Sequence, residues 1–380
     1  MKNAKAALLG FHGHRSTGDD ALASAIGWHL YKNRGVRRYV VPAEPYDLPI
    51  LPEPLGVSAP LPWLHRGRWR NKWRWSLCAK RCEILLLAGG ANLHENIDYR
   101  HYMTILKIAR NSKALVFGAI GVSMGPFSSQ TKRDECGEFL RAMDFLTLRD
   151  RDSYEIACGY SLPYKPVDAM DAVLTLPEVY GISTTPKIEL KSDALDIGVS
   201  VTPFKAMGGY GSGSAGKCLP AVIECLIGFS KRYKIRVNLF EFSGHQGDGD
   251  GPLVEAMRSE LENKCDVIIH PYHRDPSRIW KTIADMDIMI CTRFHASIFS
   301  YSAGVPFVML DYHPKCAAFA QDIGLPDELK LDVYKLAPDE LIDSLESLIS
   351  PDRPHPALAY SDALAKAELN FGPLYELLPG

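Results

Sequence analysis

Residues Asp287–Lys315 read DIMICTRFHASIFSYSAGVPFVMLDYHPK, and this stretch decides the fold. It opens with the apolar run Ile288–Ile290, which is typical of a buried strand and ends abruptly in polar and charged residues. A run with helical periodicity follows, and a glycine and a proline separate it from a second apolar run at Phe307–Leu310. Strand, helix and strand in this order predict a parallel sheet covered by helices on both faces.

Arg293 and His295 follow the first of these strands, at the point where the helix begins. Ligands of open parallel sheets bind at the carboxyl ends of strands, and helix amino termini attract anions. A guanidinium can grip a phosphate or a carboxylate through two hydrogen bonds, and an imidazole can transfer a proton near neutral pH. The pattern therefore predicts a site for a small anionic donor, with a proton-transfer step. A salt-bridged Arg293 and a His295 packed in the first helical turn would give the same local sequence.

The composition is that of an ordinary globular chain, large enough for two domains. It has 380 residues, 46% hydrophobic and 23% charged, and a net charge of −2 gives no reason to expect a nucleic-acid partner. The cysteines number nine, an odd count without a C-x-x-C pair, which favours reduced thiols and a cytoplasmic protein. No signal peptide, no apolar run of about 18 residues and no metal-ligand spacing is visible, so we expect neither a membrane span nor a required metal.

Short apolar runs alternate with helical patterns along the whole chain. The strands expected from them are 6–9, 39–41, 84–87, 114–117 and 145–148, then 197–201, 235–240, 267–270, 288–291 and 307–310. The expected helices include 19–32, 102–109, 131–142, 217–233 and 362–368. The polar stretch 180–196 lacks periodicity and reads as a linker. We therefore predict an α/β protein of two Rossmann-like domains, 1–185 and 190–350, with an interdomain cleft that binds ligands, and a tail, 351–380, that docks on the first domain.

Glycine-rich segments follow three of the strands expected in the first domain, at Gly10–Asp20, Ala88–Glu95 and Gly118–Pro126. We read them as turns, in which glycines allow a ligand to approach the backbone and polar side chains handle acceptor hydroxyls or anionic groups. The candidates for acceptor chemistry or substrate binding in these segments are His14, Asp19, Gly89, Gly90 and Ser123. A capped turn with solvated histidines would explain the first segment equally well.

Two segments of the second domain carry weaker signals. Gly211–Cys218 nearly matches a phosphate-binding P-loop, but cysteine stands where the magnesium-binding hydroxyl is needed, so we do not expect a nucleoside triphosphatase. His245 is a further candidate for substrate binding, and it could pair with Asp248 or Asp250 to move a proton. A polar turn with a helix cap is the alternative for these aspartates.

A basic, tryptophan-rich segment at 63–75 stands out in this near-neutral chain. Helical spacing relates its arginines and also its tryptophans, and this combination suits the headgroup region of an anionic membrane. The residues predicted to touch the membrane are Arg66, Trp69, Arg70, Trp73 and Arg74. A solvated basic face with the tryptophans packed inward is the alternative, and no wider basic field supports stacking on nucleic acid.

Several short motifs follow one another in a fixed order between residues 6 and 330. The most specific is Arg293-Phe-His295 with Gly304-Val-Pro306. The others are Gly18-Asp19, Leu86–Gly90, Phe117–Pro126, Leu148-Arg149-Asp150 with Ser153, Asp171-Ala-Val, and Lys315 before Phe319. In this order they resemble the polysaccharide pyruvyl transferase family. Two departures affect the acceptor side: the usual asparagine before Gly-Asp is missing, and Ala91 stands where a third glycine is common.

The resemblance implies a GT-B-like fold and transfer of the pyruvyl group of phosphoenolpyruvate to a sugar of a polysaccharide precursor, such as that of an exopolysaccharide. A ketal or an enolpyruvyl ether would form, phosphate would leave, and no cofactor is implied. Protonation of the donor's methylene would make its C2 electrophilic, with His295 as the general acid. The residues implied in holding the donor's two anionic groups are Arg293, Arg149 and Lys315. Asp19 or His14 would activate the acceptor hydroxyl.

Two other functions stay open on the sequence alone. A GT-B glycosyltransferase that uses a nucleotide sugar would bind a diphosphate with the same arginine, and a non-catalytic member of the family would bind glycan or scaffold a synthesis complex. Acceptors in such pathways are often lipid-linked. That fits a cytoplasmic enzyme that contacts the inner face of the membrane through residues 66–75.

Overall fold

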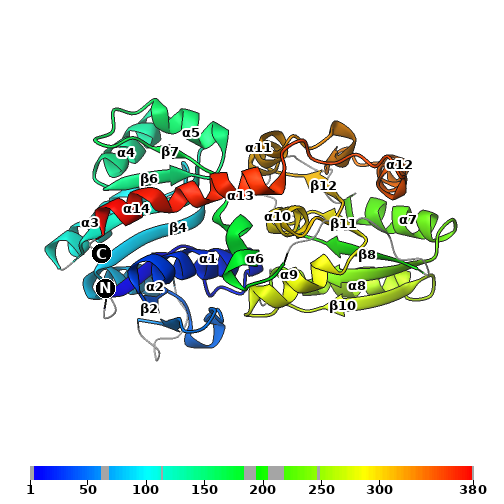
Figure 1. Cartoon of the computed structure of the whole chain (residues 1–380), viewed down its shortest axis with the longest axis horizontal. Coiled ribbons are helices and arrows are strands. Elements are labelled where there is room, and N and C mark those ends of the chain that lie inside the picture. Colours follow the sequence, from blue (N-terminus) through cyan, green and yellow to red (C-terminus); the bar gives the residue numbers. More distant parts are fainter. Residues whose placement is uncertain are drawn as a thin grey trace. The chain divides into compact units, whose positions relative to one another are not determined.

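The computed structural model describes residues 4–60, 68–112, 114–183, 194–203, 218–245 and 249–378. The chain divides into two compact units, one made of residues 1–182 and 361–380 and the other of residues 183–360 (Figure 1). The first boundary lies inside the stretch predicted as a linker, and residues 351–360 belong to the second unit. Each unit has its own parallel sheet flanked by helices.

The first unit is built on a seven-stranded parallel sheet in the order β3-β2-β1-β4-β5-β6-β7. Its strands are β1 (Lys5–Leu9), β2 (Arg38–Val40), β3 (Gly56–Ser58), β4 (Ile84–Leu93), β5 (Val116–Met124), β6 (Phe145–Leu148) and β7 (Val167–Asp168). The order reverses between β1 and β4, and open α/β sheets bind ligands at the carboxyl side of such a switch point. The segment that leaves β1 and the glycines of β4 lie there.

The second unit has a six-stranded parallel sheet in the order β10-β9-β8-β11-β12-β13. Its strands are β8 (Leu195–Ser200), β9 (Ile235–Phe240), β10 (Asp266–His270), β11 (Ile288–Cys291), β12 (Phe307–Asp311) and β13 (Lys330–Asp332). Here the order reverses between β8 and β11, and β11 leads directly to Arg293. The predicted strands at 235–240 and 288–291 are confirmed to the residue.

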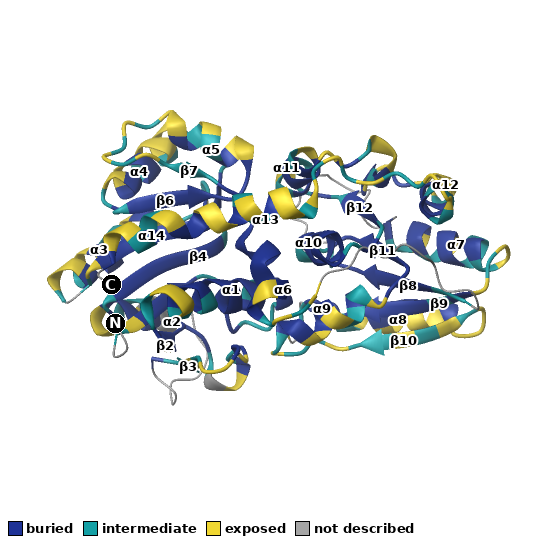
Figure 2. Cartoon of the chain, viewed as in Figure 1, coloured by how far each residue is buried: buried dark blue, intermediate teal, exposed yellow. Residues whose placement is uncertain are grey.

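Helices cover the sheets and turn their apolar sides inward, so that the strands are largely buried while the outer helical faces are exposed (Figure 2). In the first unit they are α1 (Thr17–Arg34), α2 (Arg68–Arg81), α3 (Tyr99–Asn111), α4 (Gln130–Arg141), α5 (Arg151–Cys158), α6 (Leu176–Val179) and α14 (Gly372–Leu377). In the second they are α7 (Cys218–Ser230), α8 (Gly251–Leu261), α9 (Pro276–Ala284), α10 (Phe294–Ala303), α11 (Pro314–Ile323) and α12 (Pro338–Ile349), and α13 (Tyr360–Glu368) leads back to the first unit. Within the described ranges, no helix combines the length and the apolar character needed to cross a membrane.

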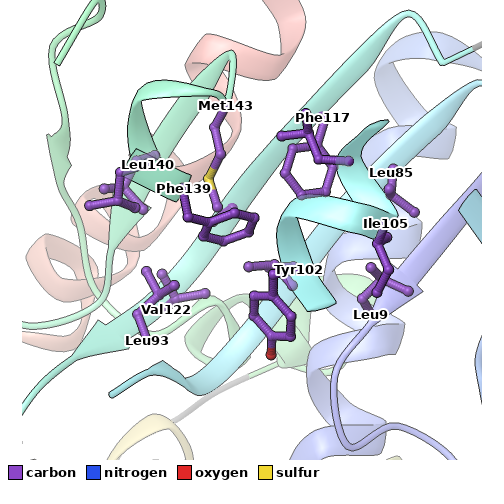
Figure 3. Close-up of a cluster of buried hydrophobic side chains, with 14 of the residues drawn as sticks. Leu9, Leu85, Leu93, Tyr102, Ile105, Phe117, Val122, Phe139, Leu140 and Met143 are labelled. Carbon is purple, nitrogen blue, oxygen red and sulfur yellow. The ribbon is translucent and has the colours of Figure 1, made fainter. Parts of the chain in front are cut away.

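One face of the first sheet packs against α3 and α4 to form an apolar core (Figure 3). Leu9, Leu85 and Phe117 reach into it from the strands, and Tyr102 and Phe139 meet them from the helices. Each fully buried side chain of this size stabilises the fold by roughly 1.5–3 kcal/mol. This core fixes the strands whose carboxyl ends carry the candidate site.

On the other face of the first sheet, residues from the end of the chain cover β5, β6 and β7, and α1 covers β4. Asn370 is fully buried, accepts a hydrogen bond from Thr147 Oγ1 at 2.7 Å and donates to the carbonyl of Met170 at 2.6 Å. Thr147 Oγ1 also accepts the amide of Gly121 at 2.8 Å. A single side chain from the C-terminal segment therefore completes the hydrogen bonding of β5 and β6.

The glycines predicted to form turns after β4 and β5 instead lie inside longer strands. Gly89, Gly90 and Gly121 all have positive φ, at 69°, 82° and 57°, and the pairing register shifts beside them. Glycine accepts this backbone conformation without a steric penalty, so each site forms a bulge that bends the strand without ending it. The prediction that turns begin at residues 88 and 118 was therefore wrong. These residues belong to strands, because β4 continues to Leu93 and β5 to Met124.

Candidate functional site

Arg293 is the N-cap residue of α10, at the carboxyl end of β11. Its amide donates to Ser200 Oγ at 3.2 Å, and its guanidinium bonds the carboxylate of Asp250 through Nε, at 3.2 Å, and through Nη2. Asp250 is fully buried and also accepts the amides of Phe242 and Ser243, each at 2.9 Å. Burial raises the pKa of Asp250, and the charge of Arg293 opposes that rise.

The ion pair matches the alternative of a salt-bridged Arg293, and contact of this residue with the donor stays a prediction. Asp250 largely neutralises the charge of Arg293. The ion pair uses Nε and Nη2 of the guanidinium, which has five N–H donors in all. The side chain remains 20% exposed. The main structural role of Arg293 is therefore to connect the start of α10, through Asp250, to the segment before α8.

His295 lies in the first turn of α10, half-buried. Its ring packs edge-on against Phe294, with centroids 5.2 Å apart. The position is the predicted one: an imidazole at the amino end of a helix, beside the switch point of the second sheet. It can deliver a proton to an anion bound at this helix end.

Lys315 lies in the first turn of α11, at the carboxyl end of β12, which pairs with β11. Its ammonium nitrogen is 5.4 Å from the ring centroid of Phe294 and 5.5 Å from that of Tyr312. Among the residues that the structure describes, no carboxylate lies within ion-pair distance of this nitrogen. Lys315 thus keeps its positive charge near the amino ends of two helices, α10 and α11. The sequence analysis did not predict that Phe294 and Tyr312 contact Lys315. The sequence shows only that these two residues stand next to Arg293 and His313.

In the first unit, the segment between β1 and α1 is fixed by buried polar groups. His12 is fully buried, and its Nδ1 donates to the carbonyl of Asp19 at 2.6 Å. The amide of Gly13 donates to buried Asp20 at 2.9 Å, and Ser16 Oγ donates to Asp19 Oδ2 at 2.5 Å. Asp19 is thereby held at the switch point.

His14 is half-buried in the same segment, and its ring stacks on Phe11 at 4.7 Å. Burial lowers the pKa of His14 below its usual value, although the nearby charge of Asp19 opposes the shift. A neutral imidazole near pH 7 can accept a proton from a hydroxyl. The two predicted acceptor residues, His14 and Asp19, therefore lie close enough to influence each other electrostatically.

Gly89 and Gly90 have different uses. A Cβ at Gly89 would lie 2.6 Å from Leu22, so this glycine allows α1 to pack on the sheet. A Cβ at Gly90 would find nothing closer than Asn92 Nδ2 at 3.6 Å and Asp19 Oδ1 at 3.8 Å. The backbone of Gly90 is thus uncovered on the side of Asn92 and Asp19, and its role in substrate binding stays a prediction.

Arg149 and Ser123 belong to a buried network rather than to an open site. Arg149 Nη1 is 3.0 Å from Asp171 Oδ2, and its Nε donates to Ser123 Oγ at 2.6 Å. Ser123 Oγ in turn donates to Asp150 Oδ2 at 2.7 Å, and Asp150 caps α5 through the amide of Ser153. The Arg149 side chain is only 2% exposed. The expectation that Arg149 contacts the donor is corrected, because its charge is paired with Asp171 inside the first unit.

His245 is exposed, and the structure does not pair it with Asp250, whose oxygens bond Arg293 and two backbone amides. Asp248, the other proposed partner, lies outside the described residues, as does the segment 211–217 of the P-loop-like motif. Across the described ranges, no group of three or more metal-binding side chains is present.

The predicted membrane-contact residues fall into three groups. Arg66 and the side chains of Trp69 and Arg70 lie outside what the structure describes. Trp73 is 67% exposed on α2. The Arg74 side chain is 2% exposed and pairs with Glu44 at 2.8 Å, so its assignment to a membrane surface was wrong.

Comparisons with solved structures show a shared fold. UDP-GlcNAc 2-epimerase from Neisseria meningitidis, bound to UDP-GlcNAc, has a TM-score of 0.61 at 9% identity, covering 98% of this chain and 99% of its own. The MnaA–UDP structure from S. aureus gives 0.60 at 10% identity, covering 98% and 97%. UDP-GlcNAc 2-epimerase from Methanocaldococcus jannaschii gives 0.57 at 9%, covering 96% and 98%. The likeness confirms a GT-B-like fold of two Rossmann-like domains.

The sequence itself was also compared with families and with curated proteins. No curated protein gave a significant match. The model of the polysaccharide pyruvyl transferase family matches residues 17–314, a range that includes Asp19, Gly90, Arg293 and His295 and ends at the start of α11. The chain belongs to the polysaccharide pyruvyl transferase family.

Proposed function

We propose that the protein transfers the pyruvyl group of phosphoenolpyruvate to a sugar of a polysaccharide precursor and releases phosphate. The observation that carries the proposal is the ammonium of Lys315, which lies over Phe294 and Tyr312 with no described carboxylate in ion-pair distance. α10 and α11 begin after the neighbouring strands β11 and β12, and their first amides and helix dipoles favour anions. A ligand with a phosphate and a carboxylate suits two such helix ends and one lysine.

His295 is the proposed general acid. It would protonate the methylene carbon of phosphoenolpyruvate, and the resulting cation at C2 would be attacked by a sugar hydroxyl, which loses its proton. The C2–oxygen bond to phosphate then breaks, and phosphate leaves. Attack by a second hydroxyl gives a ketal, whereas loss of a proton from the methyl group gives an enolpyruvyl ether.

His14 and Asp19 are the proposed acceptor residues. Burial keeps the pKa of His14 low, so its imidazole is neutral and able to take the proton of the attacking hydroxyl. Asp19 and the open backbone of Gly90 would orient the sugar through hydrogen bonds.

A thermal-shift titration of the full chain tests the donor. Phosphoenolpyruvate at 100 times its dissociation constant should stabilise the wild type by about 2.7 kcal/mol, and Lys315→Met should weaken this effect while Lys335→Met, an exposed control, should not. Lys315 is a better probe than Arg293, because removing Arg293 would leave the buried charge of Asp250 unpaired at a cost of about 3–5 kcal/mol. Stabilisation by UDP or GDP and not by phosphoenolpyruvate would instead favour a nucleotide-sugar glycosyltransferase.

A membrane-bound acceptor would be reached through α2. Trp73 is exposed, and so are Tyr46 and Ile50 in the segment that the Glu44–Arg74 pair joins to this helix. Tryptophan and tyrosine favour the membrane interface. Trp73→Ser should reduce flotation of the protein with anionic liposomes, whereas Ile268→Ser, which changes an exposed apolar residue of β10, should not. Equal flotation of both variants and the wild type would remove this contact from the proposal.

A further inference from the structure

Phe11 is an aromatic residue with 56% of its surface exposed, at the switch point of the first sheet. It is the second residue after β1. The His14 imidazole covers part of its ring, with an interplanar angle of 26°. Unlike the other exposed apolar residues, this phenyl group lies against His14 in the segment that leads from β1 to α1, so a ligand bound at these residues would remove its apolar surface from water.

The segment that carries Phe11 is held rigidly. His12 next to it is fully buried, and the Gly13 amide bonds Asp20. Arg15, whose φ is 57°, pairs with Asp47 at 2.7 Å. The ring is therefore presented in one place and needs little ordering when a ligand binds, which favours affinity.

We propose that Phe11 is the platform on which the acceptor sugar ring stacks. This inference rests on the proposed function and specifies its acceptor subsite. The apolar face of a pyranose, where axial hydrogens gather, carries a slight positive charge that complements the negative face of a phenyl ring. The His14 imidazole covers one side of the ring, so the sugar would stack on the other side, and the hydroxyls that project past the ring edge are those that would reach His14 and Asp19, whose charge acts on His14. A pyranose whose anomeric substituent is equatorial fits best, because an axial substituent interrupts the apolar face.

Saturation-transfer NMR with the full chain tests the platform without requiring turnover. The probes are the methyl β-D-pyranosides of glucose, galactose, mannose and N-acetylglucosamine, each beside its α-anomer. At least one β-anomer should bind the wild type, and Phe11→Ala should weaken it about fivefold to tenfold, as expected for one aromatic contact. Phe11→Trp should retain binding, and so should Leu115→Ala, a control that removes an exposed side chain before β5.

Unchanged affinity in Phe11→Ala, or no binding of any pyranoside to the wild type, would overturn the platform. A fall in melting temperature with unchanged sugar affinity would also overturn it, since the ring would then pack against protein. Phosphate release separates this inference from the reaction. If a sugar binds through Phe11 while phosphoenolpyruvate is not consumed, the pyruvyl transfer fails and the sugar subsite stands. If turnover occurs with the same acceptor KM in both proteins, the reaction stands and the platform fails.

Discussion

Lys315 and Arg293 are both cations at the carboxyl ends of paired strands, but their surroundings give them different roles. Arg293 faces a buried carboxylate, and its charge is balanced. Lys315 faces two aromatic rings, whose negative faces hold an ammonium without cancelling its charge. The lysine is therefore the better placed to attract a substrate anion, and the arginine to hold the start of α10.

His295→Ala should abolish transfer and leave the fold intact, because the residue is half-buried in a first helical turn. Loss of a general acid typically lowers the rate about 10²–10⁴-fold. Phosphate release measured against pH checks this, since a general acid must carry its proton and the fall in wild-type activity at high pH should vanish with the imidazole. Phosphoenolpyruvate should still stabilise the variant. Near-normal turnover by folded His295→Ala would assign the acid to another group.

At the scale of elements, Arg149 ties β5, β6, α5 and the 3₁₀ turn after Asp171 together. It bonds Ser123 at the end of β5 and Asp171 at the start of that turn, while Asp150 caps α5. In the motif Leu148-Arg149-Asp150, the arginine and the aspartate thus hold neighbouring elements of the first unit together.

Arg149→Met should lower the free energy of unfolding by about 3–5 kcal/mol, because Asp171 would remain as a buried unpaired charge. Urea unfolding measures the change. The double variant Arg149→Met/Asp171→Asn should recover part of it, since the carboxylate is then gone while the amide can still cap the turn. Full stability of Arg149→Met with loss of phosphoenolpyruvate binding would return Arg149 to the donor site.

The sequence predicts elements better than it predicts the partners of side chains. Hydrophobic patterns located β9 and β11 to the residue, because burial dictates their composition. The bulges at Gly89 and Gly90 were missed because glycine permits both a turn and a bent strand. The pairing of Arg293 with Asp250 was left open because 43 residues separate them and only tertiary packing brings them together. The sequence therefore predicted that Arg293 lies at the end of a strand, but it could not predict whether its charge is paired within the protein or available to a ligand.

At the scale of the whole molecule, the first unit is discontinuous in sequence. Its C-terminal segment returns after residue 360 and packs against α1. Phe371 stacks on the His29 ring at 3.9 Å, and the Tyr375 hydroxyl is 3.4 Å from His29 Nδ1. Burial lowers the pKa of His29 to about 4.

Because the folded pKa of His29 lies below its unfolded value, the folded state resists protonation. The contribution of neutral His29 to the free energy of unfolding is complete above about pH 6.5, and it falls by up to about 3 kcal/mol as the pH approaches 4. The stability of His29→Gln should therefore depend less on pH in this range, as measured by urea unfolding at several pH values. His355→Gln, at an exposed histidine, should follow the wild type. Parallel curves for His29→Gln and the wild type would contradict this account.

The hydrogen bonds of Asn370 impose an order on biosynthesis. Thr147 and the Gly121 amide are translated early, but the side chain that completes their network emerges from the ribosome only after the whole of residues 183–360. The second unit is continuous, so it can fold while the first still waits for its final piece. Until then the nascent first unit leaves the part of its sheet at β5 and β6 without the segment that covers it, and it is at this stage that chaperones should engage the chain.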